Sequence, residues 1–470
     1  GILVSDFLPH IGSVADDICV IKSMVTEQIN HDPAHTFLNT GSAISGRPSM
    51  GSWVNYGLGS LSNNLPGFVV LTSKSGRNPQ PIASRQWASG CLPSKFQGVE
   101  FNAKGAPVHY VDNPGGITDA RQRQVIEAVK KMDQLRDMQV HDQEIDSKIA
   151  QYKMAFRMQS SVPDLMDISD EPKSVLEEYG ATVGDGSYAS NCLLARRLAE
   201  RGVRFIHLYH RGWDHHGGLV KYMNTCCGLT DKPTWALIQD LKQRDMLKDT
   251  LVVWGGEFGR TPMFQGKGGA GRDHHVKGFS MWMAGGGIKA GLEYGKTDDF
   301  AYNIVENPVH VNDLNATILH CLGVDHERFT YRYLGLDQRL TGVEHPTVEE
   351  QELIDRSPDQ AKALCLTMTR IVYPLDDLLK CLTRDRTQLQ FGRVFVDATV
   401  WKAVAESGES KAMSYIRKTQ AVDPLWLRDT LRHRQVEILK IDSARYCADL
   451  FTKAVSNAVL AALLPIIGRS

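Results

Sequence analysis

The sequence has little of what marks the specialised classes of protein. No stretch reaches the roughly 18 consecutive apolar residues of a membrane-spanning helix, and the best candidate, 454–467, is short and interrupted by Pro465. The formal net charge is only -1, so charge gives no reason to expect nucleic acid or an anionic membrane surface as a partner. We therefore expect a globular protein with no membrane span and no nucleic-acid partner.

Cysteine is present but lacks the patterns that give it a structural use. The nine cysteines are scattered, only Cys226 and Cys227 are adjacent, and no C-x-x-C pair occurs. This excludes a zinc knuckle and a complete disulfide framework, and it leaves at least one thiol free or paired between chains. The sequence also starts at Gly1 without a charged-then-apolar leader, so we expect a targeting peptide to have been removed or not included.

Length and pattern divide the chain in two. With 470 residues, two domains are the natural expectation. Up to about residue 345, helices and strands alternate: helix 190–202 precedes strand 203–210, and helix 233–244 precedes strand 250–256. Such alternation predicts parallel strands joined by right-handed crossovers. We add strands at 68–72 and 279–284 and a helix at 311–322, so residues 1–345 form an α/β domain.

The remaining residues, 346–470, have a different character. Gly-rich strand ends stop, and helical patterns dominate at 358–371, 410–420 and 425–459. No cluster of His, Asp or Glu at ligand spacing occurs there. We predict a C-terminal helical appendage of unknown role, with oligomerisation or partner binding as the default hypothesis.

Three polar clusters lie beside apolar runs between residues 207 and 289. The carboxyl ends of parallel strands meet at one edge of a sheet, where such folds bind ligands. Carboxylate and imidazole together suit zinc, manganese or iron, and arginine suits bidentate recognition of a tetrahedral oxyanion. The alternative is a structural ion pair of Glu257 with Arg260 or Arg272. The clusters contain His210, Asp214, His215 and His216; then Glu257 and Arg260; then Arg272, Asp273, His274 and His275.

A further polar segment lies at 30–60. It brings His31, Asp32 and His35 close together in the sequence and adds the hydroxyls of Thr40 and Ser49. Ser49 stands at an expected helix start, where a serine commonly caps the free backbone N–H groups. The other interpretation makes Ser49 a nucleophile in the positive field of a helix terminus, with Thr40 as the second choice.

Several motifs together resemble a known family. NHDPAHTFLNTG, GRPSMGSWVNYGLGS, LARRLAERGVRF, GWDHHG, GGEFGRTP, GRDHH and FSMWMAGGGIKAG occur in this order. They resemble an uncharacterised sulfatase-like family, domain of unknown function 1501, of the alkaline-phosphatase superfamily, over residues 8–343. NDLNATILHCLGVDHE resembles the segment that closes the core in sulfatases and phosphoglycerate mutases. The resemblance implies an alkaline-phosphatase/sulfatase-like fold, a mostly parallel sheet flanked by helices.

The resemblance also implies an activity. It points to a metal-dependent, exported hydrolase, periplasmic or extracellular, acting on sulfate or phosphate esters of a small molecule or polysaccharide. The alternative is a catalytically inactive module that binds oxyanions or carbohydrate, and a phosphomutase-like activity ranks third. We expect a divalent ion (Zn, Mn or Ca) and oligomers formed through the C-terminal helices. The expected metal ligands are Asp214, His216, Glu257, Asp273 and His274, and the expected catalytic residues are Ser49, Arg260 and Arg272.

The sequence departs from its relatives at two points. Phe258 stands where better-studied relatives carry a histidine ligand, and the early aspartate that the family places after a Gly-Gly-Pro-Ser strand end is not in this chain, so we expect the domain to be truncated at its N-terminus. Formylglycine chemistry needs Cys-x-Pro-x-Arg, and the nearest match is CLPSK, with Lys95 in place of the arginine. We interpret CLPSK as a chance match, and it is Phe258 and the missing early aspartate that favour the binding module over the enzyme.

Overall fold

A computed structural model describes residues 2–73, 82–102, 107–108, parts of 118–131, 143–265, 271–342 and 347–355, together with strands at 363–369, 393–396 and 437–440. The chain forms two compact units. The first comprises Gly1–Pro262 and Asp273–Leu378, and the second comprises Met263–Arg272 and Leu379–Ser470.

The first unit is built on one large mixed sheet, with the strand order β12-β1-β8-β5-β15-β4-β2-β3 and β9 beside β1. Its pairings are parallel except those of β8, which runs antiparallel to both β1 and β5. The strands are β1 (Ile18–Val25), β2 (Phe68–Ser73), β3 (Val99–Phe101), β4 (Phe205–His210), β5 (Thr250–Gly255), β8 (Phe279–Ala284), β9 (Glu293–Tyr294), β12 (Val309–His310) and β15 (Ala363–Thr369).

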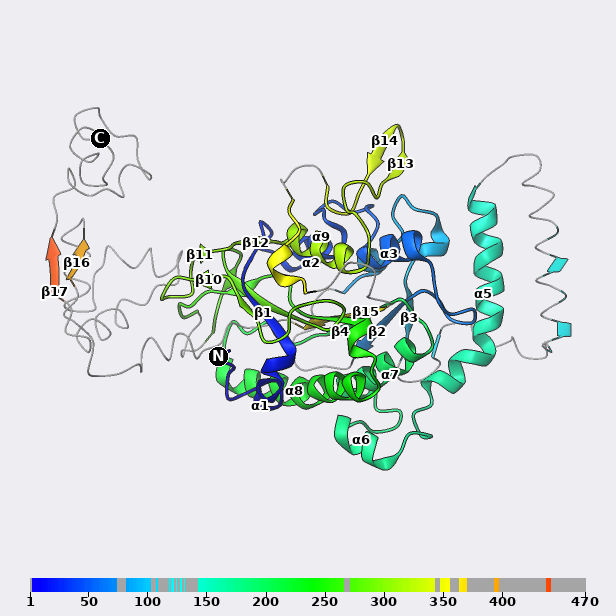
Figure 1. The fold of residues 1–470 in the computed structure, drawn as a ribbon, viewed down its shortest axis with the longest axis horizontal. Coiled ribbons are helices and arrows are strands. Elements are labelled where there is room, and N and C mark those ends of the chain that lie inside the picture. Colours follow the sequence, from blue (N-terminus) through cyan, green and yellow to red (C-terminus); the bar gives the residue numbers. More distant parts are fainter. Residues whose placement is uncertain are drawn as a thin grey trace. The chain divides into compact units, whose positions relative to one another are not determined.

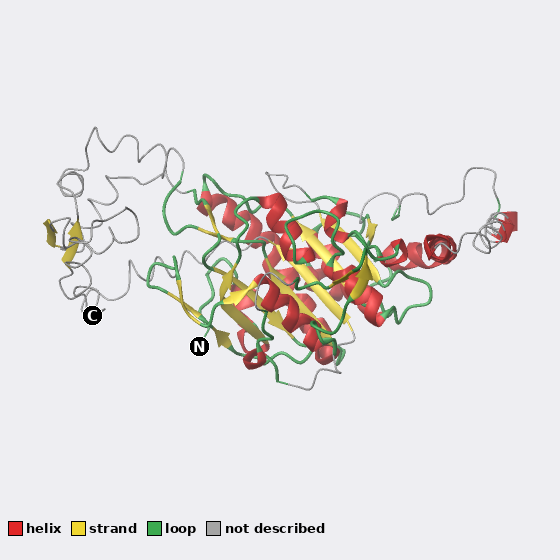
Figure 2. Ribbon diagram, turned by 90° about the horizontal axis from the view of Figure 1, so that it is seen from above, coloured by secondary structure: helices red, strands yellow, loops and turns green. Residues whose placement is uncertain are grey.

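Helices cover both faces of this sheet (Figures 1 and 2). On one face lie α1 (Pro9–Ser13), α6 (Lys173–Tyr179), α7 (Tyr188–Glu200) and α8 (Leu219–Gln243), with α5 (Gln143–Met166) at the end near β3 (Figure 1). On the other lie α2 (His31–Thr40), α3 (Met50–Leu58) and α9 (Val311–Cys321).

The strand sequences supply an apolar residue to both faces, as a sheet covered on both sides requires. In β5, Leu251 belongs to the core beneath α2, α3 and α9, and Val252 belongs to the core beneath α7 and α8. Met281 and Trp282 divide between the two cores in the same way in β8. The result is a three-layer helix–sheet–helix arrangement.

Both units contain shorter elements outside the large sheet and its helices. The first unit has the 3-10 helices Ala15–Asp17, Ser84–Trp87, Ser94–Phe96, Leu247–Asp249 and Gln351–Leu353, and the small pairs β6 (Gly259–Arg260) with β7 (His274–His275), β10 (Lys296–Thr297) with β11 (Ile304–Glu306), and β13 (Tyr331–Tyr333) with β14 (Leu336–Gln338). In the second unit, β16 (Arg393–Val396) pairs in parallel with β17 (Glu437–Lys440).

The mixed α/β architecture agrees with the expectation from the sequence, and the expected strands at 68–72, 203–210, 250–256 and 279–284 correspond to β2, β4, β5 and β8. The helix expected from residue 233 is longer: α8 begins at Leu219 and contains Pro233 in its interior. Among the described residues, none of the helices combines the length and apolar character that a membrane span needs.

The C-terminal part differs from the prediction where it is described. The helix expected at 358–371 is instead a strand over 363–369, paired in parallel with β4 and β5. Within 425–459, residues 437–440 form β17. The run ALCLTMT is short and apolar, and periodicity alone does not separate such a strand from a buried helical segment. The helix predicted at 410–420 lies outside the described residues, and the domain boundary at 345 stays a prediction.

Candidate functional site

The site lies at the edge of the sheet where strands β1, β4 and β5 end. These strands run in the same direction, because β4 and β5 are each parallel to β15 and β1 and β5 are each antiparallel to β8. Their carboxyl ends therefore share one edge. His31 begins the helix that follows β1, Asp214 follows β4, and Glu257 follows β5.

His31 is the centre of the site. Its Nδ1 lies 2.7 Å from a carboxylate oxygen of Glu257, and its Nε2 lies 3.2 Å from a carboxylate oxygen of Asp214. Its side chain is 12% exposed, whereas that of Glu257 is 1% exposed. One imidazole thus joins two carboxylates that follow different strands.

His35 lies one helical turn after His31 on α2, a spacing that places both side chains on the same helix face. Its Nε2 lies 3.7 Å from the Glu257 carboxylate oxygen that contacts His31. The ligand atoms of His31, His35 and Glu257 all lie within 4.8 Å of one another. Two imidazoles and a carboxylate at this separation match the ligand types and the spacing of a transition-metal site.

A second group shares His31. Ligand atoms of His31, Asp214 and His274 also lie within 4.8 Å of one another, and His274 Nε2 lies 3.5 Å from Asp214 Oδ1. The other ring nitrogen of His274 is 2.7 Å from the carbonyl oxygen of Ile29, which orients the ring as a backbone partner commonly does for a ligand histidine. We call the five residues of the two groups, His31, His35, Asp214, Glu257 and His274, the histidine–carboxylate cluster.

Phe258 packs against this cluster. Its ring centroid lies 5.1 Å from that of His31 and 4.6 Å from that of His274, and the side chain is 1% exposed. The residue therefore supplies an apolar wall beside the two imidazoles. A wall of this kind excludes water and strengthens the electrostatic interactions within the site.

Arg260 supplies the positive charge nearest to the carboxylates. Its guanidinium, 1% exposed, forms an ion pair with Asp214. Burial lowers the pKa of Arg260, while the negative charges of Asp214, Glu257 and Asp273 oppose that shift. Arg260 is thus a partner of Asp214 in this structure, and its expected role in holding an oxyanion stays a prediction.

Three of the five expected metal ligands, Asp214, Glu257 and His274, belong to the cluster, and two stand beside it. His216 Nε2 lies 2.9 Å from Asp214 Oδ1, with a side chain 40% exposed. Asp273 accepts a hydrogen bond on Oδ1 from the backbone N–H of His274 and pairs with Thr261 through its backbone. Both residues therefore support the cluster residues through direct contacts.

The expected catalytic residues Ser49 and Arg272 show structural contacts. Ser49 caps α3: its hydroxyl accepts a hydrogen bond from the backbone N–H of Ser52, and Ser49 is 1% exposed. This geometry agrees with the interpretation of Ser49 as a helix cap, and its role as a nucleophile stays a prediction. Arg272 belongs to the second unit, where it donates to the carbonyl of Gly271 and lies over the ring of Phe264, 4.7 Å from its centroid.

The motifs of the sequence do not identify His31 and His35 as ligands. The signal is present in HDPAH, because two histidines four residues apart share one face of a helix. The sequence predicts no helix start at residue 31, so the segment offers no helix face on which to place the two histidines. Conversely, His210 belongs to neither ligand group, and its Nδ1 lies 2.8 Å from the Ser73 hydroxyl.

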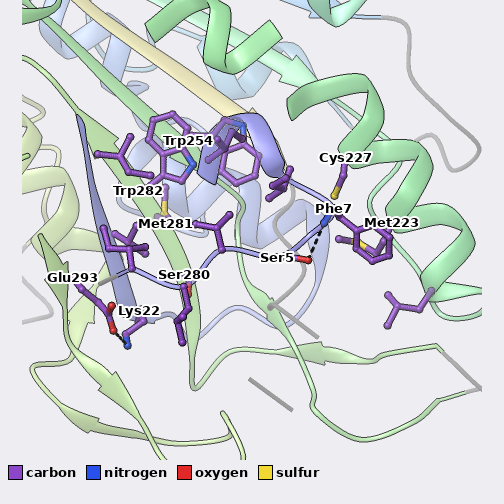
Figure 3. Close-up of a pocket in the computed structure, with 18 of the residues that line it drawn as sticks. Ser5, Phe7, Lys22, Met223, Cys227, Trp254, Ser280, Met281, Trp282 and Glu293 are labelled. Atoms are coloured by element: carbon purple, nitrogen blue, oxygen red, sulfur yellow. Dashed lines mark hydrogen bonds and ion pairs between the residues drawn. The ribbon is translucent and has the colours of Figure 1, made fainter. Parts of the chain in front are cut away.

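A separate pocket of about 130 Å³ lies among the N-terminal segment, β1, β8 and the start of α8 (Figure 3). Trp254 and Trp282 stack at one side of it, with ring centroids 5.7 Å apart. Lys22 and Glu293 form an ion pair at its edge (Figure 3). Its lining is otherwise apolar apart from two serines, so it lacks the combination of acids and imidazoles found in the cluster.

The fold and the site define a three-layer α/β protein with histidines and carboxylates gathered at the carboxyl edge of its sheet. The chain belongs to the family described as Protein of unknown function (DUF1501), whose model matches residues 1–351. No curated protein sequence matches it.

Two solved structures resemble the chain weakly. Both are of a protein called Ps i-CgsB, one of them in complex with k-i-k-neocarrahexaose. Each shows 12% identity and a TM-score of 0.33, over 67% of this chain and 66% of the solved chain. The chain therefore spans about two thirds of the length of these proteins.

Proposed function

We propose that this protein is a metal-dependent hydrolase of sulfate or phosphate esters, with an alkaline-phosphatase/sulfatase-like fold. The observation that carries the proposal is the convergence of three imidazoles and two carboxylates at one sheet edge, in two groups that share His31. A divalent ion held there would polarise an ester oxygen and would lower the pKa of a water or hydroxyl. The five residues of the histidine–carboxylate cluster would hold it.

The donor set favours particular ions. His31, His35 and Glu257 offer two nitrogens and one carboxylate, a set that zinc commonly accepts in hydrolases. Calcium prefers oxygen ligands throughout, and the second group contains only one carboxylate, Asp214. Among the three ions expected from the resemblance, zinc and manganese therefore fit these residues better than calcium.

The chain's own groups prepare the site. Glu257, at 1% exposure, is a buried carboxylate whose negative charge is weakly screened by solvent. Arg260 pairs with Asp214 and so fixes the direction in which its oxygens point. Phe258 keeps water from one side of the imidazoles. These contacts provide the orientation and the dry wall that a metal-assisted hydrolysis needs.

The test compares matched pairs of variants in the full chain. His31→Gln and Glu257→Gln alter the cluster, whereas His320→Gln and Glu349→Gln alter a second imidazole–carboxylate pair, 2.8 Å apart, on α9 and the segment after it. Bound zinc and manganese are measured after dialysis, and turnover is followed with 4-nitrophenyl sulfate and 4-nitrophenyl phosphate. We expect the cluster variants to lose at least about tenfold in metal affinity and to lose turnover, with the control pair unchanged.

The outcomes separate the two classes of function. Metal retained at wild-type affinity in both cluster variants would refute the assignment of the site. A wild-type chain that binds sulfate or phosphate, holds no metal and turns over neither ester would be the inactive binding module. The apolar ring of Phe258 at the position of a histidine ligand is the observation that favours this second candidate.

A further inference from the structure

A cavity of about 580 Å³ lies among the C-terminal end of α2, the N-terminal end of α9 and the segment 336–342. Its volume falls within the roughly 300–1,000 Å³ of small-molecule sites. Glu27 and Gln28, which precede α2, also line it. Because three residues span at most about 11 Å, Gln28 lies within that distance of His31, and this wall of the cavity faces the part of the chain that bears the histidine–carboxylate cluster.

The lining has polar side chains among its apolar ones, and these polar groups suit the hydroxyl groups of a sugar. It includes Thr40, Ser42, Asn312 and Gln338.

The two acidic side chains of the cavity already have partners. The Glu27 carboxylate lies 2.7 Å from Nε2 of His310, and the Asp337 carboxylate lies 3.1 Å from Nη1 of Arg332. These pairs leave the arginines of the lining, Arg47 and Arg339, as its positive charge.

Both arginines are in position to contact a ligand. Arg47 is exposed, follows α2 in the loop 41–47, and makes no ion pair with the described residues. Arg339 donates through Nε to the carbonyl of Gly342, and its nearest carboxylate, that of Glu327, is 3.9 Å away and 67% exposed. Anchoring through Nε leaves the terminal N–H groups directed elsewhere, and the guanidinium fork suits sulfate and phosphate.

We propose that this cavity binds the remote part of the substrate, and that the substrate is a carbohydrate with two anionic ester groups. One ester lies at the histidine–carboxylate cluster, and Arg47 and Arg339 bind the second. This inference rests on the proposed hydrolase, and it specifies the substrate class of the same site.

The test measures binding of doubly and singly charged sugars to the full chain by calorimetry. The sulfate arm compares galactose 2,6-disulfate with galactose 6-sulfate, and the phosphate arm compares fructose 1,6-bisphosphate with fructose 6-phosphate. Arg47→Ala and Arg339→Ala should weaken binding of the doubly charged sugar about tenfold or more and that of its singly charged partner less than about twofold. Arg328→Ala removes a nearby exposed arginine outside the cavity and should leave both affinities unchanged. The arm that shows the difference identifies the ester.

The two proposals fail differently. Equal affinities in the wild type and both cavity variants, in both arms, would overturn the arginine contacts even if the esters are turned over. Arginine-dependent binding by a chain that neither holds metal nor hydrolyses an ester would leave the cavity's ligand class standing and overturn the hydrolase. The variants should keep wild-type turnover of 4-nitrophenyl sulfate, whose single charge does not use the cavity; a loss there would also count against the inference.

Discussion

His210 should make the folded protein lose stability as the solution becomes mildly acidic. It is the last residue of β4, 3% exposed, with its ring 5.0 Å from that of Tyr188. Burial lowers the pKa of His210 from 6.5 to about 4. Between these two values the unfolded chain takes up a proton that the folded chain does not, so stability falls with the pH.

The size of the effect follows from the two pKa values. From pH 7.5 to pH 5.0 the unfolded imidazole becomes almost fully protonated, whereas the folded one stays about nine-tenths neutral. This difference amounts to about 2 kcal/mol in the free energy of unfolding. The contribution is complete above the unfolded value of 6.5 and is lost progressively as the pH falls towards about 4.

The assay compares the wild type with His210→Asn, which cannot titrate but keeps a polar atom near the Ser73 hydroxyl. Urea unfolding is followed by tryptophan fluorescence at pH 7.5 and pH 5.0. Any cost of the substitution to packing appears at both pH values, and only the difference between them reports the proton. We expect the wild type to lose about 2 kcal/mol more than the variant over this interval. Equal losses in the two proteins would refute the reasoning.

Two further substitutions test contacts that stabilise the first unit. Gly41→Ala should lower the free energy of unfolding by at least about 2 kcal/mol, because Gly41 follows α2 at φ 67° and a Cβ there would overlap a neighbouring backbone carbonyl oxygen. Gly180→Ala is the control, since Gly180 has φ 70° but open space around it. Equal shifts of the melting temperature in the two variants would contradict the clash. Asp231→Asn should lower the free energy of unfolding in urea by about 1–3 kcal/mol. The Asp231 carboxylate accepts backbone hydrogen bonds from His10 and Ile11 at 3.0 and 2.8 Å and so joins α8 to α1. An unchanged urea midpoint would show that these hydrogen bonds do not stabilise the protein.

Part of the site could be predicted because it follows local rules. Asp214 and Glu257 come directly after apolar strands, and the parallel direction of β4 and β5 brings such positions to one edge. His274 belongs to β7, which pairs with β6 and precedes β8 in the chain. Because β8 is antiparallel to β1 and β5, it begins at the edge of the sheet where those two strands end, and this places His274 near that edge. The sequence indicates that His274 is a possible ligand, but it does not indicate the direction of β8.

The rest depended on information that the sequence does not show locally. His31 reaches Glu257 across 226 residues of chain, a contact that no periodicity encodes. The sequence around Ser49 is consistent with both a helix cap and a nucleophile, and the hydrogen bond at the start of α3 shows the cap. Strand β15 was missed because an apolar run of seven residues satisfies both helical and strand patterns.

The place of β15 has a consequence for how the protein is made. It pairs with β4 on one side and β5 on the other, yet it is the last strand of the large sheet to be synthesised. Until residues 363–369 leave the ribosome, the facing edges of β4 and β5 have no partner and are open to pairing with other chains. A chain stopped at residue 351, where the family match ends, would lack the strand that joins the β4 half of the sheet to the half bearing Glu257. Expression of this protein as a shortened domain should therefore yield aggregates, and adding residues to 378 should restore a soluble product.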